Sequence, residues 1–342
     1  MSDRISVSSI ALTILGAVIG AGFASGQEIT QFFVRYGSSA GWGIVASTAG
    51  FLLLALWLTK VSVNSRAEQL SDLLRALGGR RPAGIFQHIF ASFMVVGLTV
   101  MVSGSATLLS HLLGVSKLLA GLGTVALVYM VSRQQTHGLA RANDLLMPCF
   151  LFLFFFYLLR SLAFSSDTAP TLVQTSYRWF WSALLYVAMN SAIMLVVIPP
   201  LVAKATSPRS AYAGVTLAIC LLAALLYLIV HLISKFQTVV PLGEMPLLAV
   251  SQYMVPSLPW LYAIPLWIAL ATTAFANAVG LRAHLQEHQP ANSEWILLLI
   301  MVSTALVSQY GFASLIALLY PLEGYACLGI LAYCLIRSLL RL

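Results

Sequence analysis

Charge is scarce in this chain of 342 residues. Only 8% of the residues are Asp, Glu, Lys or Arg, whereas 60% are hydrophobic and the mean hydropathy is +0.93. Soluble domains carry about 25% charged residues. So few charges cannot cover the surface of a particle dissolved in water, and the composition therefore excludes an ordinary soluble protein. We expect the lipid bilayer to be the main solvent of this chain.

Cysteine and clustered basic residues are also rare. The four cysteines, Cys149, Cys220, Cys327 and Cys334, stand singly in apolar runs, without the spacing of a disulfide scaffold or a zinc site. The net charge of +8 is not gathered into a basic patch with stacking aromatic residues. The sequence thus predicts neither a resident cofactor nor a nucleic-acid partner.

Apolar segments fill most of the chain. A transmembrane helix needs about 20 residues to cross a hydrocarbon core of about 30 Å. By this measure we predict an all-α integral membrane protein with ten spans. They cover residues 7–33, 39–59, 85–112, 117–132, 143–163, 178–203, 211–234, 259–283, 294–310 and 312–336.

The basic residues predict the orientation of these spans, because cytoplasmic loops collect Lys and Arg. With the amino terminus inside, thirteen of the 18 basic residues lie on the inner side. The other five are Arg35, Lys117, Arg160, Arg178 and Lys235. We therefore expect a multi-pass protein of the inner (cytoplasmic) membrane with both termini in the cytoplasm.

The spans divide into two halves of five inside a single transmembrane domain, residues 1–342. The first half covers residues 7–163 and the second covers 178–338. Because five is odd, a second half with the same fold must be inserted upside down. Such 5+5 inverted repeats occur in secondary transporters, whose binding sites lie where the first helix of each repeat is discontinuous.

The first span is rich in glycine. Gly16, Gly20, Gly22 and Gly26 lie within eleven residues, and each costs a helix about 1 kcal/mol relative to alanine. Pairs of glycines four residues apart also allow two helices to pack closely, which is an alternative explanation for the pattern.

A capping motif favours a break in the first span. Ser25-x-x-Glu28 has the pattern of a capping box, which belongs at the start of a helix and not in its interior. We therefore expect the helix to be interrupted from Gly20 to Gly26, and a second half-helix to run from Gln27 to Phe33.

The sixth span carries polar residues at a similar depth. Asn190 and Ser191 follow Tyr186, and Pro199 and Pro200 stand further along. Buried Asn and Ser side chains also bond neighbouring helices, which is the simpler explanation. The matching depth nevertheless predicts a second discontinuous helix here, facing the first.

Interrupted helices expose main-chain groups inside the membrane, which is tolerated where they line a cavity. Free N–H groups at the start of a half-helix attract a carboxylate, and free carbonyls attract a cation or an ammonium group. We therefore predict a small zwitterionic substrate such as an amino acid. The predicted substrate-binding residues are Gly20, Ala21, Gly22, Phe23, Ala24, Ser25, Gly26, Tyr186, Asn190, Ser191 and Asn277.

Two carboxylates lie deep in the predicted spans. Charging such a group inside a bilayer costs a few kcal/mol, so intramembrane carboxylates mark functional sites. Glu28 is also explained by capping, whereas Glu323, beside Pro321 and Gly324, has no such explanation. We predict a coupling or gating role for Glu28 and Glu323.

The eighth span offers further oxygen ligands. Thr272 and Thr273 lie in its middle, and Asn277 follows one turn after Thr273 on the same helix face. Hydroxyl and carbonyl oxygens are hard ligands that suit a small cation. Threonine in membrane helices often bonds its own main chain instead.

The run Gly-Ala-Val-Ile-Gly-Ala-Gly-Phe-Ala-Ser-Gly-Gln-Glu at 16–28 resembles the signature of a bacterial family of amino-acid permeases in the amino acid-polyamine-organocation superfamily. More widely, the chain resembles transporters with the leucine-transporter fold. That resemblance implies a sodium ion held by the carbonyls of Gly16 and Ile19 and by an Ala-x-x-Thr-Thr motif. The motif residues are Ala269, Thr272 and Thr273. Proton-coupled relatives place a Lys of span five there, and this span has none, which favours sodium over a proton.

Three functions remain open at this stage. The first is a sodium-coupled transporter of an amino acid. The second is a receptor or nutrient sensor built on the same scaffold, which binds its ligand without moving it. The third is an intramembrane enzyme, which needs a nucleophile and a base within reach. Ser105 and His111 are the nearest candidates, but they fall on different helix faces, so we predict that the protein is not an enzyme.

Overall fold

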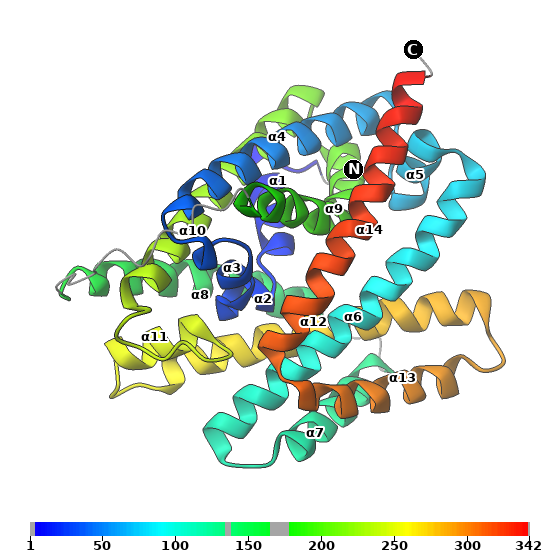
Figure 1. Cartoon of the computed structure of the whole chain (residues 1–342). Coiled ribbons are helices and arrows are strands. Elements are labelled where there is room, and N and C mark those ends of the chain that lie inside the picture. The colour runs from blue at the N-terminus through cyan, green and yellow to red at the C-terminus, as the bar shows by residue number, and fades with distance from the viewer. Residues whose placement is uncertain (1–3, 134–137, 165–177, 341–342) are drawn as a thin grey trace.

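The structure is a computed structural model that describes residues 4–133, 138–164 and 178–340, and its regular elements are helical (Figure 1). The division between the predicted halves, near residue 170, lies outside these residues. The α-helices are α1 (Val7–Val18), α2 (Ala21–Ser25), α3 (Gln27–Phe32), α4 (Ala40–Ser65), α5 (Leu70–Gly78), α6 (Arg80–Leu113), α7 (Lys117–Ser132), α8 (Gly138–Ser161), α9 (Arg178–Lys204), α10 (Pro208–Phe236), α11 (Pro246–Met254), α12 (Trp260–His288), α13 (Ser293–Val307) and α14 (Phe312–Leu340). Two 3-10 helices are η1 (Val34–Ser39) and η2 (Ser308–Tyr310).

Seven helical segments of the described chain are long and apolar enough to cross a membrane. They correspond to predicted spans two, three and six to ten. Three shorter apolar helices, Val7–Val18, Lys117–Ser132 and Pro148–Ser161, occupy predicted spans one, four and five. The structure therefore confirms a membrane protein with several apolar helices, while the count of ten spans stays a prediction.

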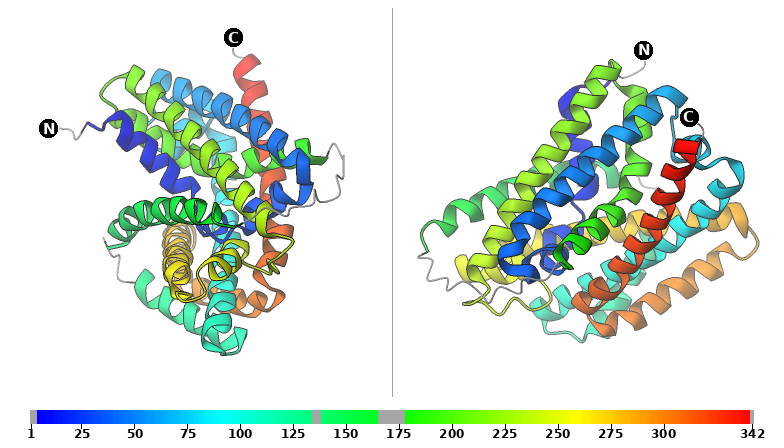
Figure 2. Two further views of the ribbon diagram at one scale, coloured as in Figure 1. Left: turned by 90° about the vertical axis from the view of Figure 1, so that its left-hand side faces the viewer. Right: turned by 45° about the horizontal axis from the view of Figure 1, so that its top comes forward.

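The long helices pack as two groups (Figure 2). In the first group α4 packs on α9 and α10, and α1 packs on α10. In the second group α6 contacts α7, α12 and α13. The helix α14 contacts both α9 and α6, and α8 contacts both α12 and α10, so these two helices join the groups. The first predicted span begins in the first group, where α1 packs on α10, and reaches the second group where α2 contacts α12.

The first span is interrupted twice, as Figure 1 shows for α1, α2 and α3. After α1 ends at Val18, Gly20 is extended, with φ −81° and ψ −179°. Gly26 then takes a left-handed conformation, with φ 78° and ψ −5°, before α3 begins. The interruptions lie where the glycines predicted them. The segment between them, Ala21–Ser25, is a helical turn, so the expectation that it is unwound was wrong.

The predicted capping box at Ser25 is not formed. The Ser25 hydroxyl donates to the Gly22 carbonyl at 2.8 Å and accepts from the Gln27 N–H at 3.2 Å. Because Gly26 is the capping residue of α3, Glu28 stands at the second helical position and not at the third. Its side chain is therefore not committed to capping.

The predicted interruption of the sixth span is wrong, because α9 runs unbroken from Arg178 to Lys204. The Asn190 amide donates to the Tyr186 carbonyl at 3.0 Å, and the Ser191 hydroxyl donates to the Ala188 carbonyl at 2.5 Å. Both polar side chains thus bond their own helix. In addition, α9 contains no glycine, and its two prolines, Pro199 and Pro200, stand in its last two turns, well beyond Asn190 and Ser191.

Candidate substrate site at the break between α1 and α2

The break leaves main-chain groups free. In a continuous helix the Gly20 N–H would bond Gly16, but here it bonds the Val18 carbonyl at 2.8 Å. Among the described residues, the Gly16 carbonyl therefore has no main-chain partner. The first amide of α2 that bonds back is that of Ala24, to the Gly20 carbonyl, so the preceding amides lack helical partners. A Cβ atom added to Gly20 would meet no other atom within 4 Å, which leaves open space beside these groups.

Two ionisable side chains approach the break at Gly22. The carboxylate oxygen Oε2 of Glu28 lies 2.6 Å from the position that a Cβ atom of Gly22 would take. The Tyr320 hydroxyl of α14 lies 3.2 Å from the same position. Glu28 is only 5% exposed. The carboxylate predicted to act in coupling thus lies against the first turn of α2.

The helices α9 and α14 complete this cluster. The side chains of Tyr186 and Asn190 face Glu28 from α9. Glu323, on α14, is near enough to Glu28 for the two carboxylates to interact electrostatically. The structure therefore brings together Glu28, Tyr186, Asn190 and Glu323, which the sequence predicted, and it adds Tyr320.

Three buried polar atoms of this region have no hydrogen-bond partner among the described residues. They are Oε1 of Gln27, Oε1 of Glu28 and the hydroxyl oxygen of Tyr186. A buried polar group without a partner costs free energy, and native proteins rarely leave one unpaired without a ligand or water. The oxygens of Gln27 and Glu28 are acceptors, and acceptors suit a cation or an ammonium group.

Aromatic rings fix Tyr186. Its ring, fully buried, lies 5.4 Å from the ring of Phe32, 4.9 Å from that of Phe33 and 5.6 Å from that of Phe51, measured between centroids. Tilted and edge-on contacts of this kind are favourable and hold the ring in one orientation. The Tyr186 hydroxyl is consequently held towards Glu28.

Another tyrosine holds α2 in place. The Tyr262 hydroxyl, on α12, donates to the Ala24 carbonyl at 2.6 Å. The Ala24 carbonyl lies at the end of α2, where the left-handed Gly26 stops the helix. The Tyr262 hydroxyl therefore gives a hydrogen-bond partner to a carbonyl near this second interruption. The Phe23 ring, also on α2, packs 6.5 Å from the ring of Phe154. These contacts give α2 a wall formed by α8 and α12.

The predicted ion ligands Ala269, Thr272 and Thr273 belong to α12, and this helix contacts α2. The buried Thr272 hydroxyl donates to the Ala269 carbonyl at 3.1 Å, and Thr273 is half-buried. Ile19 closes α1 as its capping residue. The assignment of these residues and of Gly16 to one ion stays a prediction.

Two further predicted site residues have contacts that do not involve the break at Gly20. Asn277 packs against Gly97 of α6, where an added Cβ atom would stand 2.7 Å from the Asn277 amide nitrogen. Ser191 is occupied by its own helix. Neither contact points to the break at Gly20.

Sequence reasoning missed both Tyr262 and Tyr320. For Tyr320 a signal was available, because it stands one turn before Glu323 and thus shares its helix face. Tyr262 carried no signal, since its partner is a main-chain carbonyl 238 residues away.

A cavity of about 330 Å³ lies next to the cluster, one turn beyond Glu28 along α3. Gln31 and Phe32 of α3, Ser182 of α9, and Pro321 and Tyr325 of α14 belong to its lining. Further lining residues are Arg35, Tyr36, Arg178, Trp181 and Leu185. Since Pro321 follows Tyr320 directly, this cavity borders the predicted site.

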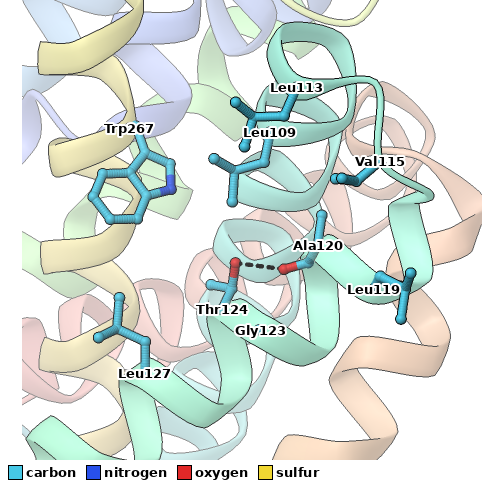
Figure 3. A pocket seen from close by; sticks show the side chains of 9 residues that line it. All are labelled: Leu109, Leu113, Val115, Leu119, Ala120, Gly123, Thr124, Leu127 and Trp267. Carbon is cyan, nitrogen blue, oxygen red and sulfur yellow. Dashed lines mark hydrogen bonds between the residues drawn. The ribbon is translucent and has the colours of Figure 1, made fainter.

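A second cavity, of about 270 Å³, lies between α6, α7 and α12 (Figure 3). Its lining includes Leu109, Leu113, Leu127 and Trp267, and the Thr124 hydroxyl within it donates to the Ala120 carbonyl at 2.8 Å. The lining carries no charge, and it does not include the break. We therefore place the candidate site at Gly20 and not here.

Ser105 and His111, the candidate nucleophile and base of an intramembrane enzyme, form no hydrogen bond with each other in the described part of the chain. Ser105 is fully buried, and its hydroxyl has no hydrogen-bond partner among the described residues. His111, near the end of α6, is exposed.

No family model matches the chain. The membrane protein YkvI of Bacillus subtilis (strain 168) is 28% identical to it over 336 residues, which cover 97% of this chain and 96% of YkvI. The protein YyaD of the same organism is 27% identical over 343 residues, covering 96% of each chain. The chain is thus similar over nearly its full length to a bacterial membrane protein.

Solved structures of transporters share the fold. MhsT in complex with L-phenylalanine aligns with a TM-score of 0.59 and 13% identity, covering 92% of this chain and 81% of MhsT. Mhp1, a nucleobase-cation-symport-1 family transporter with bromovinylhydantoin bound, also gives 0.59 and 13%, covering 90% and 72%. A manganese transporter of Eremococcus coleocola gives 0.54 and 16%, covering 89% and 69%. All three have the leucine-transporter fold, which this chain shares.

Proposed function

We propose that the protein is a secondary active transporter that moves an amino acid or a similar small zwitterion across the membrane by alternating access. One observation carries the proposal: the helix is interrupted at Gly20, and its free main-chain groups lie beside the buried carboxylate of Glu28 and open space. An interruption of this kind within a membrane suits a ligand with both donor and acceptor groups.

The two ends of a zwitterion have complementary partners here. The amides at the start of α2 suit a carboxylate. The carboxylates of Glu28 and Glu323 suit the ammonium end, and the Tyr186 hydroxyl, which faces Glu28, offers a further contact. The same two carboxylates are placed to couple or gate transport. A buried carboxylate in a membrane is costly while it is charged, and a proton or a cationic ligand removes that cost.

Sodium is the proposed coupling ion. The carbonyls of Gly16 and Ile19 and the residues Ala269, Thr272 and Thr273 would hold it. The free Gly16 carbonyl supports this assignment, and the Thr272 hydroxyl oxygen keeps lone pairs for a cation while donating to Ala269. A proton carried by Glu28 or Glu323 is the alternative.

The packing supports ten spans arranged as an inverted repeat. If α1 to α3, α4, α6, α7 and α8 correspond to α9, α10, α12, α13 and α14, each contact in one half should have a counterpart. The contact between α6 and α13 has its counterpart in that between α12 and α7, and the contact between α8 and α12 in that between α14 and α6. We further propose that the protein lies in the cytoplasmic membrane.

The similar structures do not select the substrate. Two of these structures hold L-phenylalanine and bromovinylhydantoin, and the third protein is a manganese transporter. The proposal of a zwitterion therefore rests on the donors and acceptors at the break.

A thermal-stability screen tests the proposal. Purified protein is heated with each amino acid in sodium buffer and in potassium buffer, because a ligand that binds only the folded state raises the melting temperature. We expect at least one amino acid to stabilise the protein, and more strongly in sodium. Uptake of that compound into proteoliposomes along a sodium gradient then tests transport.

The outcomes separate the alternatives. Binding without uptake would favour the receptor or sensor, and uptake driven by a proton gradient alone would replace sodium as the coupling ion. If no compound of a broad panel bound or entered the liposomes under any gradient, the transporter proposal would be wrong.

A further inference from the structure

Three histidines meet at one end of the second helix group, apart from the candidate substrate site. His284 and His288 lie one turn apart on the last part of α12, and His88 faces them from the first part of α6. One ring nitrogen of each lies within 4.8 Å of those of the other two. His284 is half-buried and the other two are exposed, so water and ions have access.

The spacing of the ring nitrogens matches a metal site. A zinc ion binds histidine nitrogens at about 2.0–2.1 Å in tetrahedral geometry, which places two such nitrogens about 3.3 Å apart. The observed distance between Nδ1 of His88 and Nε2 of His284 is 3.2 Å. The separation of these two nitrogens therefore fits two ligands of one metal ion.

A contact of His288 with the main chain decides which of its ring nitrogens can bind a metal. The rings of His284 and His288 are stacked, with centroids 4.3 Å apart. Nδ1 of His288 lies 3.0 Å from the His284 main-chain carbonyl. A proton on that nitrogen, donated to the carbonyl, leaves Nε2 unprotonated and free to bind a metal, which is how second partners commonly fix metal-binding histidines.

We propose that His88, His284 and His288 bind one divalent transition-metal ion, with Zn²⁺ as the best fit. Three imidazoles suit zinc, cobalt, nickel or copper and disfavour magnesium and calcium, which take oxygen ligands. Three protein ligands leave a fourth position for water. The nearby Glu287 adds a negative charge that favours a cation.

The bound metal would join α6 to α12 at this end. These two helices also pack together further along, where Met94 contacts Gly280. A metal at the histidines would therefore stiffen the second helix group without touching the break at Gly20. The proposed site is independent of the proposed substrate and coupling ion.

The experiment uses the full-length protein, purified without a polyhistidine tag and stripped of metal. Cobalt(II) is titrated in, and its visible absorption reports tetrahedral coordination by nitrogen; zinc is then added to displace it. We expect one equivalent of cobalt to bind, full displacement by zinc, and a zinc-induced rise in melting temperature.

Single variants locate the site. His88→Gln and His284→Gln should each weaken cobalt binding at least tenfold, about the lower limit found when supporting groups of metal sites are removed. His111→Gln and His231→Gln, which alter histidines elsewhere, should bind as the wild type does. Melting temperatures without metal show whether each variant folds.

Some results would overturn the proposal. One is the absence of tetrahedral cobalt absorption in the folded wild type. Another is unchanged affinity in the folded His88→Gln or His284→Gln protein. In either case the histidines form only an imidazole hydrogen bond between α6 and α12. Because binding is measured without substrate or gradient, failure here leaves the transporter proposal standing.

Discussion

Gly22 has no room for a side chain. A methyl group there would meet the ends of the Glu28 and Tyr320 side chains, at 2.6 Å and 3.2 Å. Both are flexible ends, so Gly22→Ala should displace them at a modest cost in stability, about 1–2 kcal/mol. We expect substrate-induced stabilisation to be lost while the protein still folds, as measured by thermal melting with and without substrate.

Gly41→Ala is the matched control for this change. A Cβ atom on Gly41, in α4, would meet nothing within 4 Å. Its melting temperature should stay the same or rise slightly, and substrate should still stabilise it. A Gly22→Ala protein that responded to substrate as the wild type does would separate Gly22 from the site.

Glu323 offers a second test at the scale of single residues. Glu323→Gln keeps the shape of the side chain and removes its negative charge. If this carboxylate meets the ammonium end of the substrate, the variant should bind substrate about tenfold more weakly, since a hydrogen bond between charged partners contributes about 1.5–3 kcal/mol. Binding is measured by titration calorimetry at several pH values, because loss of a titrating group should also change the pH dependence.

Glu287→Gln serves as its control, because Glu287 is an exposed carboxylate at the end of α12. It should leave substrate affinity unchanged. Equal affinity and equal pH dependence in Glu323→Gln and the wild type would reassign Glu323 to packing.

At the scale of whole elements, Gly26 connects α2, α3 and α11. A Cβ atom there would stand 2.8 Å from Cγ and 3.1 Å from the main-chain nitrogen of Leu247, in α11, and 3.0 Å from Ile233. The residue also has a left-handed conformation, with φ 78°. We expect Gly26→Ala to destabilise the protein by about 2–4 kcal/mol, because strain in the main chain and overlap with α11 add together.

A comparison with Gly114→Ala separates these two costs. Gly114 is left-handed as well, with φ 69°, but nothing lies within 4 Å of its Cβ position. That variant should lose only about 1 kcal/mol from the conformation itself. Equal losses of melting temperature in the two variants would show that contact with α11 does not constrain Gly26.

The Glu244 carboxylate, in the segment between α10 and α11, forms hydrogen bonds with residues of α6, α7 and α14. It accepts from the Lys117 ammonium of α7 at 2.5 Å, from the Thr107 hydroxyl of α6 at 3.1 Å and from the Phe312 N–H at the start of α14 at 2.6 Å. Partial burial alone would raise the pKa of this carboxyl group. The Lys117 and main-chain bonds outweigh that effect and hold its pKa below the usual value.

This arrangement predicts a pH effect. Because the folded-state pKa of Glu244 is lowered, its stabilising contribution is present above the ordinary Glu pKa of about 4.3 and is lost as pH falls through the folded-state value. Glu244→Gln should melt at a lower temperature than the wild type at pH 6–8, and this difference should vanish towards pH 3. In Glu68→Gln, an exposed control, the melting temperature should follow the wild type throughout. A constant difference for Glu244→Gln across the range would contradict the role of its charge.

The break in the first span could be predicted from its glycines, because each glycine destabilises the helix at its own position, whatever its neighbours in space. The details depended on distant contacts. Gly26 fits closely against Leu247, and Tyr262 satisfies Ala24 across 238 residues. For α9 the same reasoning failed, because whether Asn190 bonds its own helix or a ligand depends on a rotamer that the sequence does not specify.

At the scale of the whole molecule, the orientation of the predicted spans can be tested directly. Thirteen of the 18 basic residues lie on the predicted inner side. Green fluorescent protein fused after Leu342 should therefore fluoresce, and alkaline phosphatase fused there should be inactive. Phosphatase inserted after Val115, between α6 and α7, should be active because that turn is predicted to face outwards. The reverse pattern would invert the topology.

Composition and apolar segments were sufficient to predict a helical membrane protein, and the motif at 16–28 to predict the transporter fold. The arrangement into two helix groups depends on packing between segments far apart in sequence, such as α4 on α9. Three apolar helical segments are shorter than a full span, including α1, which ends at Val18 because the glycines stop it. Apolar length alone could not show where such helices end.

The continuity of α9 has a mechanical consequence. Because α9 has no hinge between Arg178 and Ile198, we expect it to tilt as one rod against α4 and α14, the helices on which it packs. Its first turns line the cavity beside Glu28, and at its far end the Lys204 carbonyl accepts from the Ile5 N–H at 3.0 Å. A tilt of α9 that moves Trp181 in the cavity lining would therefore also load the contact between Lys204 and Ile5 at the other end of the helix.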